Sequence, residues 1–361
     1  MVAKGASMAN VAKEIITPKE PGVFRVVFLY VGQGDSTLLV VPNGTSYDYV
    51  LVDSNVDTLP KTIDLTKLFK DLFKDTEDGL AVYINTHPHK DHLDEVKKIY
   101  NEIGIKQLWH SGHKPGGDHK EVYEDLEYVM KKLGEKNVFR LLGSKSENKL
   151  DEATVKLGDI DYNVIAPAEY VCDEIEDEKA EDRYRRIHEQ SGVIRFKYGK
   201  KEKQVLITGD ADYTAWKEHI TDYHRDRLPS KVLKAAHHGS NSFFWKDSDT
   251  KDDPYKDHLD KIKPTYIVVS APTKKESRHD HPDDEAMDLY QKEVGEDNLF
   301  HLGKKRECVI VDITSEGEID LYTDDELVSE YGIKDDGDDN KGSKKEASPI
   351  IVTKLDKKPM G

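Results

Sequence analysis

The sequence has few cysteines and no long apolar run. Cys172 and Cys308 are the two cysteines among 361 residues, too few and too far apart for a disulfide framework or a zinc knuckle. No window approaches the roughly 18 consecutive apolar residues that span a bilayer. Residues 1–14 contain no apolar signal core. We therefore expect a cytoplasmic protein without a membrane segment.

Basic charge is also scarce relative to acidic charge. The chain has 54 lysines and arginines against 71 aspartates and glutamates, a formal net charge of −17. This balance argues against charge-driven binding to long nucleic acid or to anionic membranes. It does not exclude a local basic groove, because some lysines cluster in the sequence. These are Lys197, Lys200, Lys201, Lys203, Lys274 and Lys275.

Histidine, by contrast, is concentrated in residues 86–92, which read Thr-His-Pro-His-Lys-Asp-His. The apolar run at residues 80–84 precedes this stretch and predicts a buried strand. The apolar residues within 93–100 have helical spacing. Three histidines and an aspartate are therefore expected on a short strand-to-helix loop. A polar surface loop with chance histidines is the weaker alternative.

The spacing within this loop suits two cations. His87 and His89 are two residues apart and can turn toward one cation, while the adjacent Asp91 and His92 can reach a second. Imidazole nitrogens and carboxylate oxygens are ligands that zinc and its transition-metal neighbours prefer. Two metals roughly 3.5–4 Å apart can clamp a reacting phosphoryl or acyl group. We predict a two-metal centre.

The His-x-His-x-Asp-His pattern is the signature of the metallo-β-lactamase-fold hydrolases, and other motifs follow in the family's order. The strand predicted at residues 205–207 ends in a Thr-Gly-Asp that resembles the fourth motif. The strand predicted at 231–236 runs into a His-His-Gly-Ser that resembles the fifth motif in its ComEC-like form. Residues 31–36, with Gly-Gln-Gly-Asp-Ser at their heart, resemble a ComEC motif, although a plain hairpin turn is the alternative. The resemblance covers about residues 23–322.

The resemblance implies an α/β fold, a four-layer αββα metallo-β-lactamase sandwich, with two divalent metal ions, zinc or manganese. Two carboxylates, Asp53 and Asp35, are expected to brace the metal loop from behind. His238 is favoured over His237 as the ligand of the second metal, and the sequence does not decide between them. The implied ligands are His87, His89 and His188 for the first metal, Asp91, His92 and His238 for the second, and Asp210 between them.

Two positions depart from the family pattern. His188 stands three residues before Ser191, where ComEC-like chains often have asparagine, so His188 is expected to be a true third ligand of the first metal. Asp94 and Glu95 stand where relatives usually have glycine, and we expect their side chains to narrow access to the metals.

The resemblance also implies a chemistry. A metal-bridging water would lose its proton near neutral pH, and the hydroxide would attack phosphorus or a carbonyl. We expect Asp91 to steer this nucleophile and His237 or His281 to protonate the leaving group. His281 matches a His-Pro found near this place in ComEC-like proteins, with a polar loop before a helix as the alternative.

The predicted function is that of a phosphodiesterase or nuclease acting on nucleic acid or nucleotides. A hydrolase of small esters, lactones or thioesters is the first alternative, because fold does not determine chemistry. A metal-stabilised binding or effector module with little hydrolysis is the second alternative.

The chain ends flank this predicted hydrolase domain, residues 23–322. Residues 1–22 are expected to form a leader whose first seven residues resemble a cloning remnant. Residues 323–361 are expected to be an acidic, disordered tail, in which the apolar residues 350–352 could dock on the body or on a protein partner. The loop at 110–119 carries three histidines and is either a substrate entrance or a solvated loop.

Overall fold

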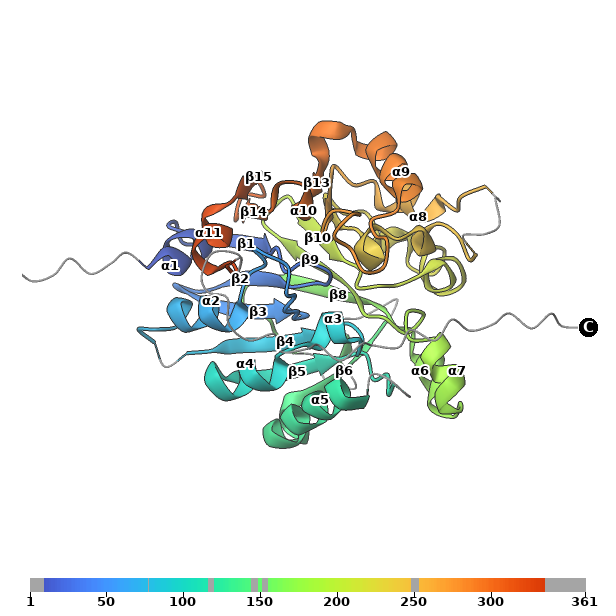
Figure 1. The fold of residues 1–361 in the computed structure, drawn as a ribbon, viewed down its shortest axis with the longest axis horizontal. Helices are drawn as coiled ribbons and strands as arrows, with labels where there is room; N and C mark the ends of the chain where they lie inside the picture. The colour runs from blue at the N-terminus through green and yellow to red at the C-terminus, as the bar shows by residue number, and fades with distance from the viewer. Residues whose placement is uncertain are drawn as a thin grey trace, which may run out of the picture.

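The computed structural model describes residues 10–76, 78–115, 120–143, 149–150, 155–247 and 253–334. Two β-sheets pack face to face, with helices on their outer sides (Figure 1). This is the four-layer αββα sandwich predicted from the sequence, and the prediction of the fold class is confirmed. No helix among the described residues is long and apolar enough to cross a membrane.

Among the described residues, the first sheet has nine strands, some parallel and some antiparallel. Strands β3, β4, β5 and β6 are parallel, whereas β15, β14, β1, β2 and β3 form an antiparallel series. The strand order is β15 (Ile319–Asp324), β14 (Cys308–Thr314), β1 (Val23–Phe28), β2 (Thr37–Asn43), β3 (Ser46–Val52), β4 (Leu80–Asn85), β5 (Ile105–His110), β6 (Val138–Leu142) and β7 (Lys149–Leu150).

The second sheet has six strands. Strands β10 to β13 are parallel, and β8, β9 and β10 are antiparallel. The order is β13 (Leu299–His301), β12 (Tyr266–Val269), β11 (Val232–Lys234), β10 (Lys203–Ile207), β9 (Val193–Tyr198) and β8 (Asp161–Ala166). The parallel strands are short apolar runs because both of their faces are covered.

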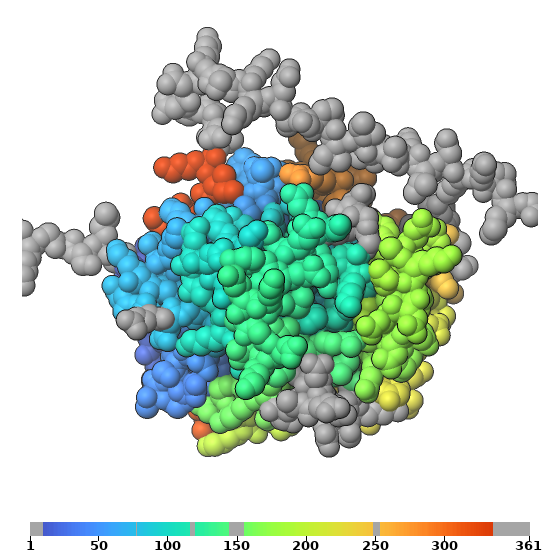
Figure 2. All heavy atoms as spheres, turned by 90° about the horizontal axis from the view of Figure 1, so that it is seen from below, coloured from blue at the N-terminus to red at the C-terminus, as the bar shows by residue number. Residues whose placement is uncertain are grey.

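Helices cover the outer faces of both sheets (Figure 1). Figure 2 shows α5 across the face seen from below, with α6 and α7 at its right edge. The α-helices are α1 (Val11–Ile16), α2 (Leu65–Leu72), α3 (Lys90–Leu93), α4 (Val96–Glu102), α5 (Lys120–Leu133), α6 (Glu169–Glu176), α7 (Ala180–Arg185), α8 (Asp257–Ile262), α9 (Asp284–Val294), α10 (Leu302–Lys305) and α11 (Glu326–Tyr331). Short helical turns are η2 (Glu135–Asn137), η3 (Ala215–Ile220, π-helical), η4 (Arg225–Arg227), η5 (Ala236–Gly239), η6 (Asn241–Phe243) and η7 (Glu296–Asn298).

Two apolar clusters account for the layering. The larger one joins the facing sides of both sheets to helices α1, α2, α4, α5 and α11. The smaller one lies between the second sheet and the segments η3, η6, α8 and α9. The sandwich therefore has one core between the sheets and further apolar layers under its helices.

The folded body extends beyond the predicted boundaries at both ends. In the expected leader, α1 buries Ala12 and Ile16 completely. In the expected tail, α11 buries Leu327 and Tyr331, and the Tyr331 hydroxyl accepts a hydrogen bond from the Ala12 N–H at 3.0 Å. The two ends thus pack on one another, a long-range contact that local composition does not reveal. Residues 335–361, including 350–352, lie outside the described residues.

One predicted helix is divided in the structure. The helix expected at residues 93–100 is interrupted between α3 and α4, because Glu95 adopts a positive φ of 64°. The spacing of apolar residues predicted the helix, but not the break within it.

Candidate metal centre

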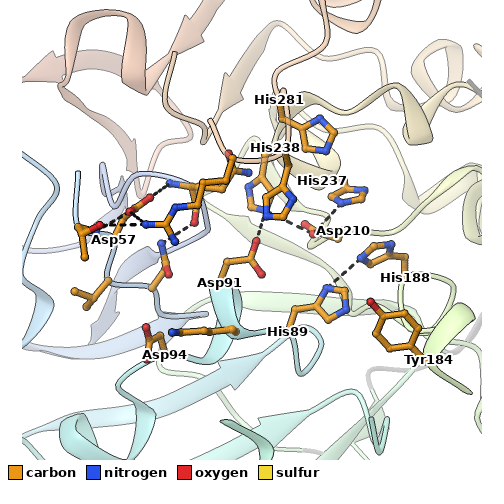
Figure 3. A pocket seen from close by; sticks show the side chains of 17 residues that line it. Asp57, His89, Asp91, Asp94, Tyr184, His188, Asp210, His237, His238 and His281 are labelled. Carbon is orange, nitrogen blue, oxygen red and sulfur yellow. Dashed lines mark hydrogen bonds and ion pairs between the residues drawn. The ribbon is translucent and has the colours of Figure 1, made fainter. Parts of the chain in front are cut away.

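The polar residues that follow buried strands in the sequence meet at one edge of the two sheets. The histidine loop follows β4, Asp210 follows β10, and His237 and His238 follow β11. A cavity of about 400 Å³ opens at this edge (Figure 3). It is lined by Gln33, Asn55, Val56, Asp57, Thr58, His89, Lys90, Asp91, Asp94, Tyr184, His188, Asp210, His237, His238, Arg278, His279 and His281.

A first cluster joins His87, His89, His188 and Asp210, with one ligand atom of each within 4.8 Å of the others. His188 Nε2 lies 3.2 Å from His89 Nδ1, and His87 Nε2 lies 3.6 Å from Asp210 Oδ2. This is the set expected for the first metal, and it includes His188, which comes from the loop after α7.

A second cluster joins Asp35, His92, Asp210 and His238, with one ligand atom of each within 4.8 Å of the others, and Asp91 lies beside it. His92 Nε2 is 3.2 Å from Asp210 Oδ2 and 3.1 Å from His238 Nε2. His238 Nε2 is also 3.4 Å from Asp91 Oδ2 and 3.5 Å from Asp210 Oδ2. Asp210 therefore faces both clusters, the place expected for a bridging carboxylate.

These distances suit divalent metal ions. Tetrahedral ligands bound at about 2.0–2.2 Å lie roughly 3.3–3.5 Å apart, close to the spacings within both clusters. In addition, His87 Nε2 and Asp210 Oδ1 are buried and have no hydrogen-bond partner among the described residues. Buried polar atoms without a partner are costly unless something else binds them. Both clusters can therefore hold a metal ion.

Asp53 fixes the orientation of the histidine loop. Its carboxylate accepts hydrogen bonds from the Thr86 N–H at 2.7 Å and the Thr86 hydroxyl at 2.6 Å. It also lies 2.9 Å from His92 Nδ1. A proton on Nδ1 leaves Nε2 of His92 as the free lone pair, directed toward Asp210. The position of Asp53 is that of a carboxylate supporting a ligand.

Asp35 lies at the back of the second cluster and pairs with a residue that the sequence analysis missed. Its carboxylate approaches Nδ1 of His92 and of His238, at 3.7 and 3.5 Å, on the side away from Asp91 and Asp210. It forms an ion pair with Lys234, whose side chain is 1% exposed. Burial by itself would raise the pKa of Asp35, but Lys234, His238 and His92 together outweigh burial, and the pKa is lowered. The available signal was a lysine within the apolar strand at 231–236.

The Gly-Gln-Gly-Asp-Ser segment packs directly on the metal loop. A Cβ at Gly34, which has a φ of 147°, would lie 2.4 Å from the Asp91 carbonyl oxygen. The Asp35 N–H donates to that same oxygen at 3.1 Å, and the Ser270 hydroxyl donates to the Gly34 carbonyl at 2.8 Å. The segment is therefore more than a hairpin turn, because it ties the metal loop to the second sheet.

The two adjacent histidines after β11 face different neighbours. His238 is 1% exposed and its Nδ1 is 3.0 Å from the Ser270 carbonyl, which leaves Nε2 for the second cluster. His237 lines the cavity, its Nδ1 lies 2.7 Å from the Ser242 hydroxyl, and its Nε2 is 3.7 Å from Asp210. This geometry favours His238 as the ligand. Both residues have positive φ, 47° and 54°, and this tight turn separates their directions.

His281 also lines the cavity, with its ring 5.3 Å from that of His237 (Figure 3). Its Nδ1 lies 3.4 Å from Asp283 Oδ2. The two histidines predicted as proton donors are therefore neighbours at one side of the clusters.

The loop that carries His188 is held by side chains on both of its flanks. Gln190 Oε1 lies 2.7 Å from His113 Nδ1. Glu189 pairs with Arg186 and lies 2.9 Å from His219 Nε2. The described part of the 110–119 loop lines a different cavity, through His110, Gly112 and Lys114. Its contribution to the metal centre is this support of the His188 loop.

Burial and charge divide the site histidines into two groups. Burial lowers the pKa of His188 and of His237 to about 3 and that of His87 well below its usual value, so these imidazoles are neutral. For His87 and His188 this is the form in which an imidazole binds a metal. Burial would also lower the pKa of His92 and His238, but Asp210 and the other carboxylates raise both, that of His238 to about 10. The second cluster is thus a place where the carboxylates stabilise positive charge.

Asp94 and Glu95 differ in their effect on the cavity. Asp94 lines it, as expected for a side chain that narrows access. Glu95 instead accepts a hydrogen bond from the Thr66 hydroxyl at 2.8 Å and pairs with Lys98 at 2.5 Å. The expectation for Glu95 is wrong, because its positive φ directs the side chain toward α2 and along α4.

No family model and no curated protein matches this chain. The metallo-hydrolase Igni18 of the archaeon Ignicoccus hospitalis is similar in structure, with a TM-score of 0.41 and 13% identity, over 82% of this chain and 98% of that chain. A CmlA β-hydroxylase variant matches with a TM-score of 0.41 and 12% identity. The match covers 79% of this chain and about half (52%) of that protein. A metallo-β-lactamase mutant from Cronobacter sakazakii matches with a TM-score of 0.31 and 11% identity, over 60% and 78% of the two chains.

Proposed function

We propose that this protein is a metal-dependent hydrolase that cleaves phosphodiesters in nucleotides or short nucleic acid. The observation that carries the proposal is the pair of ligand clusters that share Asp210 at an accessible cavity. Two divalent metals held this way would supply Lewis acidity and an activated water near neutral pH. His87, His89 and His188 would hold the first ion, Asp91, His92 and His238 the second, and Asp210 both.

The remaining polar side chains supply the proton transfers. Asp91 lies at the edge of the second cluster and is partly exposed, so it can accept a proton from the attacking water. His281 lines the cavity beside the clusters, and a proton on its ring can pass to the departing oxygen. His237, whose pKa is lowered to about 3, is neutral and less suited to this role.

The charges around the cavity favour a short substrate. Among the described lining residues, lysine and arginine are represented by Lys90 and Arg278. The clustered lysines lie elsewhere, and Lys197, Lys200 and Lys201 form ion pairs with acidic residues. With a net charge of −17, there is little to attract a long polyanion. A nucleotide or a short nucleic-acid strand can bind through the charges at the cavity itself, Lys90 and Arg278.

The residues that line the cavity also argue against the two alternative functions. A hydrolase of small apolar esters or lactones would need an apolar pocket, whereas Val56 is the one aliphatic side chain among the described lining residues. If the protein only bound partners, the metal-ligand side chains could be closed off from substrate. Four of them line the cavity instead: His89, Asp91, His188 and His238.

The test is hydrolysis of bis-p-nitrophenyl phosphate, cyclic nucleotides and short DNA and RNA oligomers with zinc or manganese, and with chelator. We expect up to two metals per chain by elemental analysis, and turnover that chelator abolishes. Asp210→Ala should abolish turnover because both clusters lose a shared ligand, whereas Asp222→Ala, at an exposed carboxylate, should be fully active. Metal-loaded protein that turns over esters or lactones and no phosphodiester would contradict the proposal.

A further inference from the structure

Gln33 places an unused hydrogen-bond donor in the wall of the metal cavity. Its side chain is 6% exposed and lines the cavity. Its Nε2 is buried and has no hydrogen-bond partner among the described residues. A buried amide without a partner is costly, and this one lies in the wall of the cavity that Asp91, Asp210 and His238 also line.

Ser277 determines which way the carboxamide faces. The Ser277 hydroxyl accepts hydrogen bonds from the N–H groups of His279 and His281, at 3.2 and 3.1 Å. Its single proton is therefore available for Gln33 Oε1, 2.7 Å away. A hydroxyl has one proton to donate, so the oxygen of the amide must face Ser277 and the NH₂ group must face the other way.

The main chain of Gln33 is held independently of its side chain. Its N–H donates to Asp57 Oδ2 at 2.9 Å, and its carbonyl accepts from Asn55 Nδ2 at 2.8 Å. The flanking Gly32 and Gly34 both have positive φ. Asp57 in turn accepts a hydrogen bond from Arg278 at 3.2 Å. Three separate loops thus fix the position of one residue whose amide donor meets no acceptor in the described part of the chain.

We propose that Gln33 Nε2 donates a hydrogen bond to a non-bridging phosphoryl oxygen of the substrate, with Ser277 as the residue that orients it. This inference rests on the proposed function and adds a substrate-binding donor that is not a metal ligand. A phosphoryl oxygen is a strong acceptor, and a hydrogen bond to a charged group is worth about 1.5–3 kcal/mol, or about 10- to 100-fold in binding.

The experiment compares Gln33→Leu, Gln33→Glu and Ser277→Ala with the wild type in the metal-loaded protein. Gln33→Glu keeps the shape of the side chain and the acceptor facing Ser277, but replaces the NH₂ donor by an anionic oxygen. Gln291→Leu makes the same change as Gln33→Leu at an exposed position of α9 and is the matched control. The readouts are metal content, affinity for inorganic phosphate by calorimetry, and kcat and KM for a phosphodiester.

We expect unchanged metal content in every variant. Phosphate affinity and kcat/KM should fall about 10- to 100-fold in Gln33→Leu, at least as far in Gln33→Glu, and less in Ser277→Ala, with no change in Gln291→Leu. Wild-type affinity and kinetics in both Gln33 variants would overturn this inference alone. A wild-type protein that neither cleaves phosphodiesters nor binds phosphate would overturn the proposed function, and this inference with it.

Discussion

At the scale of single residues, the most consequential interaction outside the ligand clusters is the ion pair between Lys234 and Asp35. Both side chains are buried, at 1% and 5% exposure. Asp35 stands behind His92 and His238, so the lysine neutralises a carboxylate that the second cluster needs nearby. Buried charges are tolerated when they are paired.

Removing one partner of this pair should be costly. We expect Lys234→Met to lower the free energy of unfolding by about 3–5 kcal/mol, because the buried Asp35 carboxylate loses the cation closest to it. The double variant Lys234→Met/Asp35→Asn should recover part of the loss. Denaturant unfolding of the metal-free proteins measures both. A double variant less stable than Lys234→Met would show that the pair does not act through charge neutralisation.

At the scale of elements, the break between α3 and α4 is held by Glu95 in a conformation that favours glycine. Its φ is 64°, where a residue with a Cβ is strained. Its side chain compensates through the contacts with Thr66 and Lys98. A glycine at this position would allow the same break without the side-chain contacts.

Comparing the stability of two Glu95 variants tests whether the backbone at this position is strained. We expect Glu95→Gly to be more stable than Glu95→Ala by about 1 kcal/mol, since both lose the side-chain contacts and only alanine retains the strain. Within a regular helix the order is the reverse. Thermal or denaturant unfolding gives the difference, and an alanine variant as stable as the glycine variant would contradict the assignment of strain.

A second element-scale feature is His258, which joins α8 to η6. Its Nδ1 accepts a hydrogen bond from the Leu259 N–H at 2.8 Å, and its Nε2 donates to the Phe243 carbonyl at 3.0 Å. The neutral ring is therefore fully bonded, and it stacks on the Phe243 ring at 3.9 Å. Burial lowers the pKa of His258 from 6.5 to about 4.

This shift has a consequence for stability in acid. The unfolded chain takes up the proton first as the pH falls below about 6.5, so stability is lost between about pH 6.5 and pH 4. At pH 5 the contribution of His258 should be lower by about 2 kcal/mol than at pH 7.5. His258→Phe should therefore lose less stability between these pH values than the wild type, although it is less stable overall. An equal pH dependence of the unfolding free energy in His258→Phe and the wild type would contradict this. The control is His279→Gln, which replaces an exposed histidine.

At the scale of the whole molecule, the two ends of the described chain close the first layer of helices. The Lys61 N–H donates to the Ile333 carbonyl at 2.9 Å, and the Ile333 N–H donates to the Thr62 carbonyl at 2.9 Å. Together with the contact between Tyr331 and α1, these bonds join α11 to the body. The segment is part of the fold.

Two truncations separate this segment from the rest of the tail. A chain that ends at Lys334 should unfold at the same temperature as the full chain, because the removed residues are mostly charged or small, rich in Asp, Lys, Gly and Ser. A chain that ends at Tyr322 should lose about 5 kcal/mol, since Leu327, Val328 and Tyr331 are no longer buried. Calorimetry of both proteins measures this. Equal stability of the two truncations would show that α11 contributes nothing.

By itself the sequence determined the strands that carry the site, the αββα architecture and the polar residues that meet at its edge. Apolar runs and the order of His and Asp motifs are local features, so they can be interpreted from the sequence alone. Only the tertiary structure decided which nitrogen of each histidine faces the clusters, because the backing groups Asp53 and Ser270 come from distant segments. It likewise decided that Lys234 is buried against Asp35, that Glu95 turns away from the cavity, and that Gln33 is oriented by Ser277. Each of these depends on contacts between residues far apart in the chain, and no local pattern encodes them.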